Sequence, residues 1–203
     1  MTRRPLPLLL AALMASACST QPASFHTLAS PIAATPASAG PRQPAFDALS
    51  VDVPAMLDRH AMVVRHGAHG VTVEAAQRWA SPFPEEVRDA IKARLAQASA
   101  PPSAAGPAAA TPRSIEVDIL RVDAWLDDHV AIDAAWTLHF KAPDRPALHA
   151  RGVFLAPAKG GFAGLAAAQQ RAVSALADCI ARDLALTPPD DPAPHPCPRQ
   201  RRP

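Results

Sequence analysis

The chain has 203 residues, with 20 lysines and arginines against 18 aspartates and glutamates. Arg3 and Arg4 are the only charged residues among the first 17, so the remainder carries equal numbers of basic and acidic side chains. So neutral a chain is not expected to bind nucleic acid, or to bind membranes through a polybasic surface. Its length suits one folded domain with flexible ends.

The first residues have the features of an export signal. Arg3 and Arg4 precede an apolar run over residues 6–14, and the small residues Ala15 and Ala17 stand where a signal peptidase cuts. The run is much shorter than the roughly 20 residues that a membrane-spanning helix needs. We therefore predict a signal peptide over residues 1–17 and an exported protein.

Cys18 directly follows the predicted cleavage site, and the site is compatible with two kinds of processing. Ordinary secretion would leave a free terminal thiol, whereas lipoprotein processing would acylate the cysteine with chains such as palmitate. Acylation is favoured because a lone exposed cysteine is a poor choice in a secreted protein and a small polar segment follows. Ala15 stands where lipoproteins more often have Leu, so secretion stays open. Two or more acyl chains would anchor the protein stably to a membrane. By resemblance to lipoprotein sorting in Gram-negative bacteria, a Ser rather than an Asp directly after the cysteine, here Ser19, favours the outer membrane.

Proline, alanine and serine are concentrated in three segments of the chain. Such segments bury too little apolar surface to order themselves. They divide the chain into a flexible tether over 18–45, a folded domain over 46–186 with an internal loop at 99–112, and a disordered tail over 187–203.

The domain is expected to open with three short strands and a helix. Strands are predicted over residues 47–53, 61–65 and 70–74, the last two joined by a turn at Gly67–Gly70. A helix is predicted over 84–98, because a proline and two acidic residues suit its first turn. Apolar residues then follow at a spacing of four: Val87, Ile91 and Leu95.

The clearest strands follow the internal loop. Alternation over residues 115–124 changes phase at Ile119 and Leu120, which predicts a β-bulge. The turn Asp127–Asp128 leads to a cleanly alternating strand over 130–140. A strand over 147–155 is expected to pair with it in a hairpin centred on Asp144. This register would place bulky side chains opposite small ones, with Trp136 opposite Gly152 and Ala134 opposite Phe154. It would also place His139 opposite His149.

Gly160 and Gly161 are expected to end this strand, and a helix follows over residues 163–186. Its apolar residues have helical spacing, and alanines on the same side permit close approach to a sheet. The predicted fold is α+β, a two-layer α/β sandwich in which two main helices pack on one face of a mostly antiparallel sheet.

Two groups of residues resemble motifs of a known family. The first group is Pro54-Ala55-Met56-Leu57-Asp58-Arg59 with the strand that follows, and the second is Arg78-Trp79-Ala80-Ser81-Pro82-Phe83. Both are similar to motifs of the ABC-type transport auxiliary lipoproteins, the PqiC-like lipoproteins of MCE systems. Phe25-His26-Thr27-Leu28 resembles the start of the same family. The resemblance implies a structural or partner-contact role for seven residues: Pro54, Asp58, Arg59, Arg65, Arg78, Trp79 and Pro82.

The resemblance implies a lipoprotein that is not an enzyme and needs no cofactor. Its acyl chains would hold it on the periplasmic face of the outer membrane. There it would serve as a docking partner for an MCE-domain protein and associated inner-membrane transport components, which together move lipids between the two membranes. The resemblance also allows a ring of like subunits.

A second class of function rests on one tripeptide. Arg65-His66-Gly67 matches the Arg-His-Gly motif of histidine phosphatases, in which a histidine at a strand end accepts a phosphoryl group. That chemistry also needs a second histidine, further arginines and an acid. The tripeptide alone is a weak signal, so a docking lipoprotein is favoured over a periplasmic phosphatase.

Histidine pairs are expected at one turn and on one sheet face. His66 and His69 flank the turn, and His139 is expected beside His149. A zinc site needs three or four converging ligands. We therefore expect polar surface histidines and no metal site.

The remaining cysteines and the tryptophans are open to more than one interpretation. Cys179 and Cys197 remain once Cys18 is acylated, and an exported protein permits a disulfide bond between them. Cys179 could instead be a buried free thiol. Trp79 and Trp136 are expected in the core, whereas Trp125, beside a turn, is the best placed of the three for an exposed contact.

Overall fold

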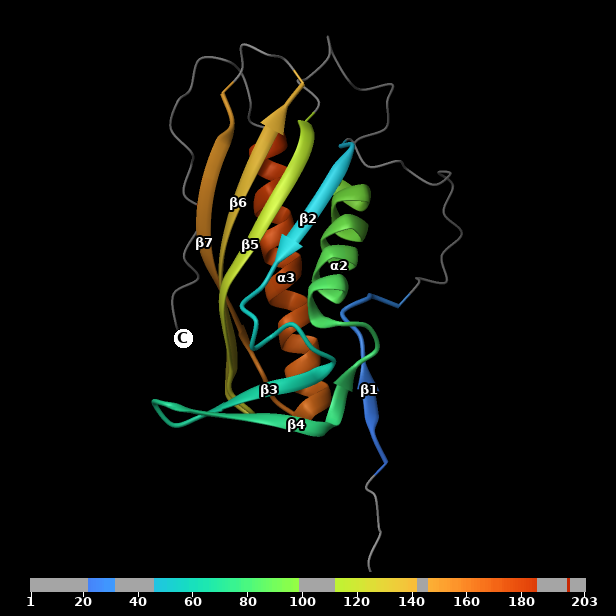
Figure 1. Ribbon diagram of the computed structural model, residues 1–203, viewed down its shortest axis with the longest axis vertical. Helices are drawn as coiled ribbons and strands as arrows, with labels where there is room; N and C mark the ends of the chain where they lie inside the picture. Colours follow the sequence, from blue (N-terminus) through green and yellow to red (C-terminus); the bar gives the residue numbers. More distant parts are fainter. Residues whose placement is uncertain (1–21, 32–45, 99–111, 142–145, 186–196, 198–203) are drawn as a thin grey trace, which may run out of the picture.

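The computed structural model describes residues 22–31, 46–98, 112–141 and 146–185, together with Cys197 (Figure 1). Within these residues the chain forms two helices and two sheets. The elements in chain order are β1 (Ser24–His26), β2 (Ala48–Asp52), β3 (Ala61–His66), β4 (Gly70–Trp79), α2 (Phe83–Ala98), β5 (Pro112–Ala124), β6 (His129–Phe140), β7 (Leu148–Pro157) and α3 (Gly161–Ala185).

The strands form a larger and a smaller sheet, both of mixed direction. The larger sheet has the order β2-β5-β6-β7, with β2 parallel to β5 and the other pairs antiparallel. The smaller sheet has the order β1-β4-β3, with β1 parallel to β4. The α+β class is confirmed. Most strand pairs are antiparallel, as expected, but the strands form two sheets and not one. The two parallel pairs join strands far apart in the chain, and local patterns carry no information on such pairs.

The core lies between the larger sheet and the helices. Helix α3 contacts β5, β6 and β7, while α2 contacts β2 and α3, and Figure 1 shows both helices running along the sheet. Alternate residues of β6 are buried as the sequence predicts, and α3 adds a stripe of apolar side chains and alanines. Each large apolar side chain buried here contributes roughly 1.5–3 kcal/mol. The buried residues of β6 are Val130, Ile132, Ala134, Trp136 and Leu138.

The predicted β-bulge in β5 is confirmed. Ile119 lies opposite Ala134 and Arg121 lies opposite Asp133, so Leu120 is the additional residue between them. Its side chain is 43% exposed. The bulge explains why the apolar alternation changes phase at this point of the strand.

The turn between β5 and β6 is tied to the start of α3. Asp127 has a φ of 57°, a left-handed conformation that aspartate tolerates better than most residues. Its carboxylate accepts the N–H groups of Gly160 at 3.0 Å and Gly161 at 2.8 Å. These bonds fix the point at which the chain leaves β7 and enters the last helix.

The β6–β7 hairpin has a register two residues away from the predicted one. Trp136 lies opposite Ala150 and not opposite Gly152. A shift of two residues leaves every side chain on its original face, so the alternation is the same in both registers. Gly152 still makes room for both rings, since a Cβ there would lie 3.0 Å from Phe154 Cζ and 3.6 Å from Trp136 Cη2. The other predicted pairs shift likewise: Leu148 lies opposite Leu138, Phe154 opposite Ile132 and His149 opposite Thr137.

Part of the segment expected as a tether is folded. Residues 24–26 form β1, and Leu28 is only 1% exposed. A strand of three residues is too short to show an alternation, and its partner β4 begins more than 40 positions later. Among the described residues, no helix is both long and apolar enough to cross a membrane.

Candidate docking surface at the first strand

Glu86 is a buried carboxylate that fastens the N-terminal segment to α2. It lies in the first turn of the helix, where backbone N–H groups have no partner within the helix and the helix dipole favours negative charge. Its Oε1 accepts the Ser81 N–H at 3.0 Å, and its Oε2 accepts the Leu28 N–H at 2.8 Å and the Thr27 hydroxyl at 2.7 Å. The sequence pattern indicates only the helix start and gives no signal of these distant partners.

The segment over residues 24–30 is also held by β4 and α3. The strand β1 pairs with β4, and the Ala80 N–H donates to the His26 carbonyl at 2.8 Å. From α3, Gln170 Nε2 donates to the Leu28 carbonyl at 3.1 Å. The chain is therefore fixed in position only a few residues after the predicted acylation site.

The two family-like motifs meet at this corner. The Pro54 carbonyl accepts the Leu57 N–H at 2.7 Å and so forms the turn after β2. The Arg59 carbonyl accepts the Phe83 N–H at 3.2 Å, which joins the first motif to the start of α2. The buried rings of Trp79 and Phe83 pack with their centroids 5.6 Å apart. Trp79 thus lies in the core, as expected from the sequence, and packs against the start of α2.

The other motif residues differ in exposure. The side chains of Asp58 and Arg59 are exposed, whereas Pro82 is half-buried and its carbonyl accepts the Glu85 and Glu86 N–H groups. Arg78 is half-buried, and its Nε has no hydrogen-bond partner in the described part of the chain. Asp58 and Arg59 are therefore the motif side chains at this corner that are best exposed for contact with another molecule.

Arg65 and His66 lie at the end of β3, where the β3–β4 hairpin turns. Arg65 Nε lies 2.6 Å from a carboxylate oxygen of Asp123, and Arg65 Nη1 donates to the Ala68 carbonyl at 3.1 Å. His66 is exposed and pairs with Gly70. A phosphate would have to displace Asp123 from the arginine, so this geometry does not favour phosphohistidine chemistry.

The smaller sheet has one buried face and one face that is partly open. Along β3, Met62 and Val64 are buried in the core, while Ala61, Val63 and Arg65 alternate with them on the opposite side. We call this opposite side the outer face. It lies at the end of the molecule where β1, β3 and β4 are found together (Figure 1).

Neighbouring strands extend the outer face with exposed apolar side chains. Val73 lies opposite Val63, and Val71 lies opposite Arg65. On the other side of β4, Phe25 lies beside Arg78, which itself pairs with Ala61. Phe25 is 65% exposed, and Val71 and Val73 are 46% and 45% exposed. The outer face is therefore an apolar surface with arginines among its valines and its phenylalanine.

The histidines do not gather into a metal site in the part of the chain that the structure describes. No group of three or more His, Cys, Asp or Glu side chains there could hold a metal ion. His149 Nδ1 lies 3.0 Å from Thr137 Oγ1, and His139 Nε2 lies 3.3 Å from Glu116. The predicted pairing of His139 with His149 is wrong, because the hairpin register differs by two residues.

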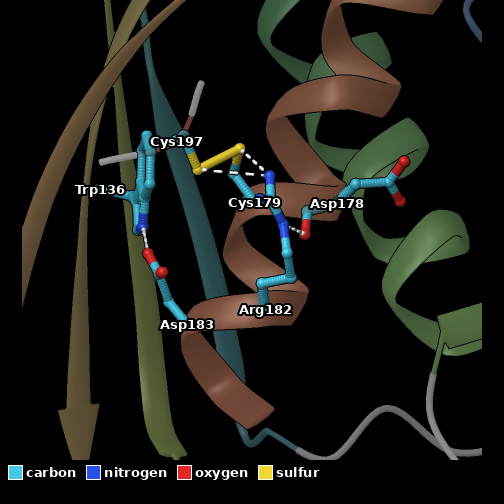
Figure 2. The surroundings of a disulfide bond; sticks show 6 residues. All are labelled: Trp136, Asp178, Cys179, Arg182, Asp183 and Cys197. Carbon is cyan, nitrogen blue, oxygen red and sulfur yellow. Dashed lines mark hydrogen bonds between the residues drawn. A yellow bond between two sulfur atoms is a disulfide. The ribbon is translucent and has the colours of Figure 1, made fainter. Parts of the chain in front are cut away.

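A disulfide bond joins Cys179 in α3 to Cys197 (Figure 2). The Cα atoms are 6.0 Å apart, and both cysteines are buried. Arg182 Nη2 lies 2.9 Å from the Cys179 sulfur and 3.6 Å from the Cys197 sulfur. The bond holds Cys197 against the last helix.

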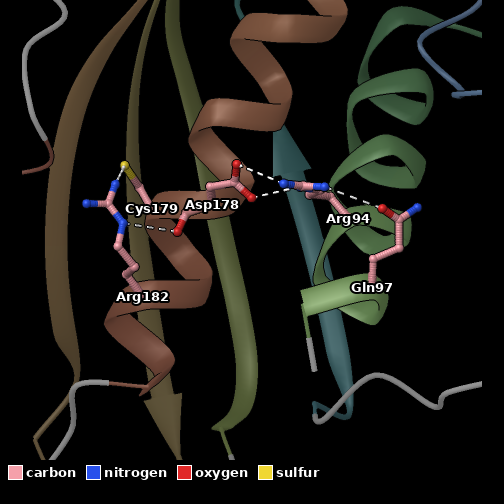
Figure 3. A network of polar contacts seen from close by, with 5 residues as sticks. All are labelled: Arg94, Gln97, Asp178, Cys179 and Arg182. Atoms are coloured by element: carbon pink, nitrogen blue, oxygen red, sulfur yellow. Dashed lines mark hydrogen bonds and ion pairs between the residues drawn. The ribbon is translucent and has the colours of Figure 1, made fainter. Parts of the chain in front are cut away.

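Two aspartates of α3 connect the helix to its neighbours. Asp183 is buried and accepts the Trp136 indole N–H at 2.8 Å (Figure 2). On the exposed side, Asp178 accepts two bonds from Arg94 of α2, at 2.7 and 3.2 Å (Figure 3). The hydrogen bond to Asp178 raises the pKa of the Arg94 guanidinium. Helix α3 is thus bound to the sheet on one side and to α2 on the other.

Trp125 is less open than the sequence suggests. It is half-buried, and its ring stacks on His129 with the centroids 6.2 Å apart. Trp79 and Trp136 are buried, as expected. The larger exposed aromatic surface belongs to Phe25.

Several predicted features fall outside the described residues. These are the signal peptide over 1–17, Cys18 with Ser19, the tether apart from residues 22–31, the loop over 99–112 apart from Pro112, and the tail apart from Cys197. The described chain begins at Pro22, four positions after the predicted acylation site.

Comparison with known proteins gives one family and two similar structures. The family model described as "ABC-type transport auxiliary lipoprotein component" matches residues 26–181. A crystal structure of an uncharacterized protein is similar at 16% identity and a TM-score of 0.59, covering 81% of this chain and 99% of its own. A crystal structure from Xanthomonas campestris, assigned to the DUF330 family, is similar at 16% identity and a TM-score of 0.55, covering 80% and 95%. These structures support the fold alone. No curated protein matches the chain significantly.

Proposed function

Because the chain belongs to the family of ABC-type transport auxiliary lipoprotein components, we propose that it is a non-catalytic docking lipoprotein of an MCE-type lipid-transport system. In this proposal Cys18 is acylated and holds the domain at the periplasmic face of the outer membrane. The folded domain binds an MCE-domain protein, which connects it to transport components of the inner membrane. The system moves phospholipid between the two membranes.

The extent of the family match is the observation that carries this proposal. The match begins in β1 and ends in α3, so it includes both sheets and both helices. The motifs within it build the corner that fixes residues 24–30 against β4, α2 and α3. A docking component benefits from such an attachment, because it holds the partner-binding surface in a set orientation above the membrane.

The exposed motif residues are the proposed contacts with the MCE partner. Asp58 and Arg59 are exposed in the turn before β3, and Met56 in the same turn is 46% exposed. Met and Arg are both enriched at protein interfaces relative to the rest of the surface. The turn is held in shape by the Pro54 and Arg59 carbonyl bonds, so the contact residues are preorganised.

Photo-crosslinking in intact cells tests the docking role. The full chain with a photoreactive residue in place of Arg59 is expected to capture an MCE-domain protein. The matched control carries the same residue in place of Lys92, which is also exposed but lies on α2. Capture of other copies of this chain would support an assembly of like subunits. Recovery of no MCE-domain protein from either position would contradict the docking proposal.

Fractionation tests the anchor separately. Cys18→Ser is expected to abolish incorporation of labelled fatty acid and to move the folded protein from the outer-membrane fraction to the soluble periplasm. Cys197→Ser serves as the matched control, since it removes a cysteine but should keep the label. Retention of Cys18→Ser in the membrane fraction would show that the anchor lies elsewhere.

A further inference from the structure

The outer face of the smaller sheet is an apolar surface that the described fold leaves partly uncovered. Three of its large apolar side chains, Phe25, Val71 and Val73, are each exposed by more than 40%. We propose that this face rests on the phospholipid surface of the membrane that holds the acyl anchor, with these three side chains inserted at the level of the headgroups. The inference rests on the proposed acylation of Cys18.

The length of chain before β1 is the first argument for a membrane as the occupant. Six peptide steps separate Cys18 from Ser24, and a fully extended chain of that length reaches at most about 20 Å. The strands of the larger sheet are much longer, since the 12 residues of β6 extend over about 40 Å. An acylated Cys18 therefore keeps the end of the molecule that carries β1 close to the membrane.

The position of the outer face is the second argument. Phe25 belongs to β1 itself, and β4, which carries Val71 and Val73, is the strand that β1 pairs with. Figure 1 shows β1, β3 and β4 at the same end of the molecule, away from the far ends of α2 and β2. The short link from the anchor thus leads directly into the sheet that carries the exposed apolar residues.

The chemistry of the outer face also suits a phospholipid surface. Aromatic and aliphatic side chains insert at the boundary between headgroups and acyl chains, and aromatic rings are enriched there. Arg78 lies beside Phe25, and its guanidinium is suited to a lipid phosphate. The balanced charge of the chain predicts that apolar insertion, and not a polybasic surface, supplies the attraction.

Tryptophan fluorescence with brominated lipids tests the proposal. The acylated full chain is reconstituted into vesicles of phosphatidylethanolamine and phosphatidylglycerol, to which phospholipid with brominated acyl chains is added as a quencher. Phe25→Trp and Val73→Trp place a new indole on the outer face. Thr72→Trp is the matched control, because Thr72 is an exposed neighbour on the same strand that pairs with Val64 and so lies on the opposite face.

The expected result is a selective loss of emission. After subtraction of the wild-type signal, brominated lipid quenches the indoles at positions 25 and 73 strongly and the indole at position 72 little. Equal quenching at all three positions, in protein that still floats with the vesicles, would overturn the proposed membrane contact and leave the anchor intact. Wild-type protein that fails to float would contradict the anchor and, with it, this inference. If the indoles at positions 25 and 73 become shielded from solvent only when an MCE-domain protein is added, the outer face is a protein-binding surface instead.

Discussion

The Leu28 N–H donates a hydrogen bond of 2.8 Å to Glu86 Oε2, which joins two residues 58 positions apart in the chain. The carboxylate also accepts the Thr27 hydroxyl and the Ser81 N–H. A single acidic side chain therefore closes the start of α2 and binds the segment that follows the proposed lipid anchor. The segment is part of the folded domain, and its attachment depends on Glu86.

Replacement of Glu86 tests this attachment. Glu86→Ala is expected to lower the free energy of unfolding by about 3 kcal/mol, because hydrogen bonds to a charged group contribute roughly 1.5–3 kcal/mol and buried N–H groups would lose their partner. Urea unfolding of the full chain measures the effect. Glu85→Ala, at the exposed neighbouring position, should change the stability by less than about 0.5 kcal/mol. Equal effects of the two substitutions would show that the three bonds contribute little.

The buried bond between Trp136 and Asp183 is expected to stabilise the contact between the sheet and α3. Trp136→Phe removes the indole N–H that donates to the carboxylate at 2.8 Å and leaves space in a packed core. The expected loss is about 2–4 kcal/mol, which combines a lost hydrogen bond to a charged group with incomplete filling of the site. Trp125→Phe, at a half-buried position, should cost less than about 1 kcal/mol in the same urea titration. A smaller loss at position 136 than at 125 would refute the assignment.

The disulfide bond between Cys179 and Cys197 closes a loop with a sequence separation of 18. Cross-linking a loop of this size restricts the unfolded chain and contributes roughly 3 kcal/mol. Cys197→Ser is therefore expected to reduce the free energy of unfolding by about that amount. A reductant should destabilise the wild type to the level of the variant and leave the variant unchanged. Sensitivity of Cys197→Ser to the reductant would show that another bond is involved.

The exposed ion pair on β6 and β7 should make stability depend on pH in a defined direction. Arg151 donates two hydrogen bonds to Asp133, at 2.9 and 2.6 Å, and these bonds hold the pKa of Asp133 below its ordinary value, against a smaller opposing effect of burial. The unfolded chain therefore takes up a proton at Asp133 at a higher pH than the folded chain does. The contribution to stability is present above an ordinary pKa of about 4 and is lost as the pH falls through the folded value.

Urea midpoints measured against pH test this direction. The difference between wild type and Asp133→Asn should be largest near neutral pH, shrink as the solution is acidified and shrink also in high salt, since exposed pairs are screened. Arg151→Gln should raise the pKa of Asp133 towards its ordinary value and so reduce the part of the stability that is lost on acidification. A difference that grows on acidification would reverse the assigned sign.

The sequence predicts the strands and helices that have strong local patterns. The alternation over residues 130–140 marks the buried face of β6, and the phase change at Leu120 marks the bulge, because in both cases the side chain pattern directly reflects the pleat. The apolar spacing of four, from Val87 to Leu95, marks the buried side of α2. These features depend on neighbours in the chain.

The sequence does not predict how segments far apart in the chain pair with one another. The β6–β7 register is wrong by two residues, since an even shift leaves the faces of Trp136 and Phe154 unchanged. The strand β1 and the long-range role of Glu86 have no local signal, because their partners lie more than 50 positions away. The motifs around Trp79 resemble the family, but the sequence does not indicate that they meet Leu28 at one corner.

The parallel pairings of β1 with β4 and of β2 with β5 affect the order in which the proposed exported chain would fold. Ala48 in β2 pairs with Ser114 in β5, and the Leu28 carbonyl receives its bond from Gln170, 142 positions later. Contacts so distant in the chain form slowly, because the intervening segment must first be brought together. A chain that enters the periplasm from its N-terminus cannot complete the corner around Leu28 until α3 has arrived. In the proposed lipoprotein, the corner around Leu28 would therefore close last, which would leave an interval in which processing enzymes reach Cys18 before folding is complete.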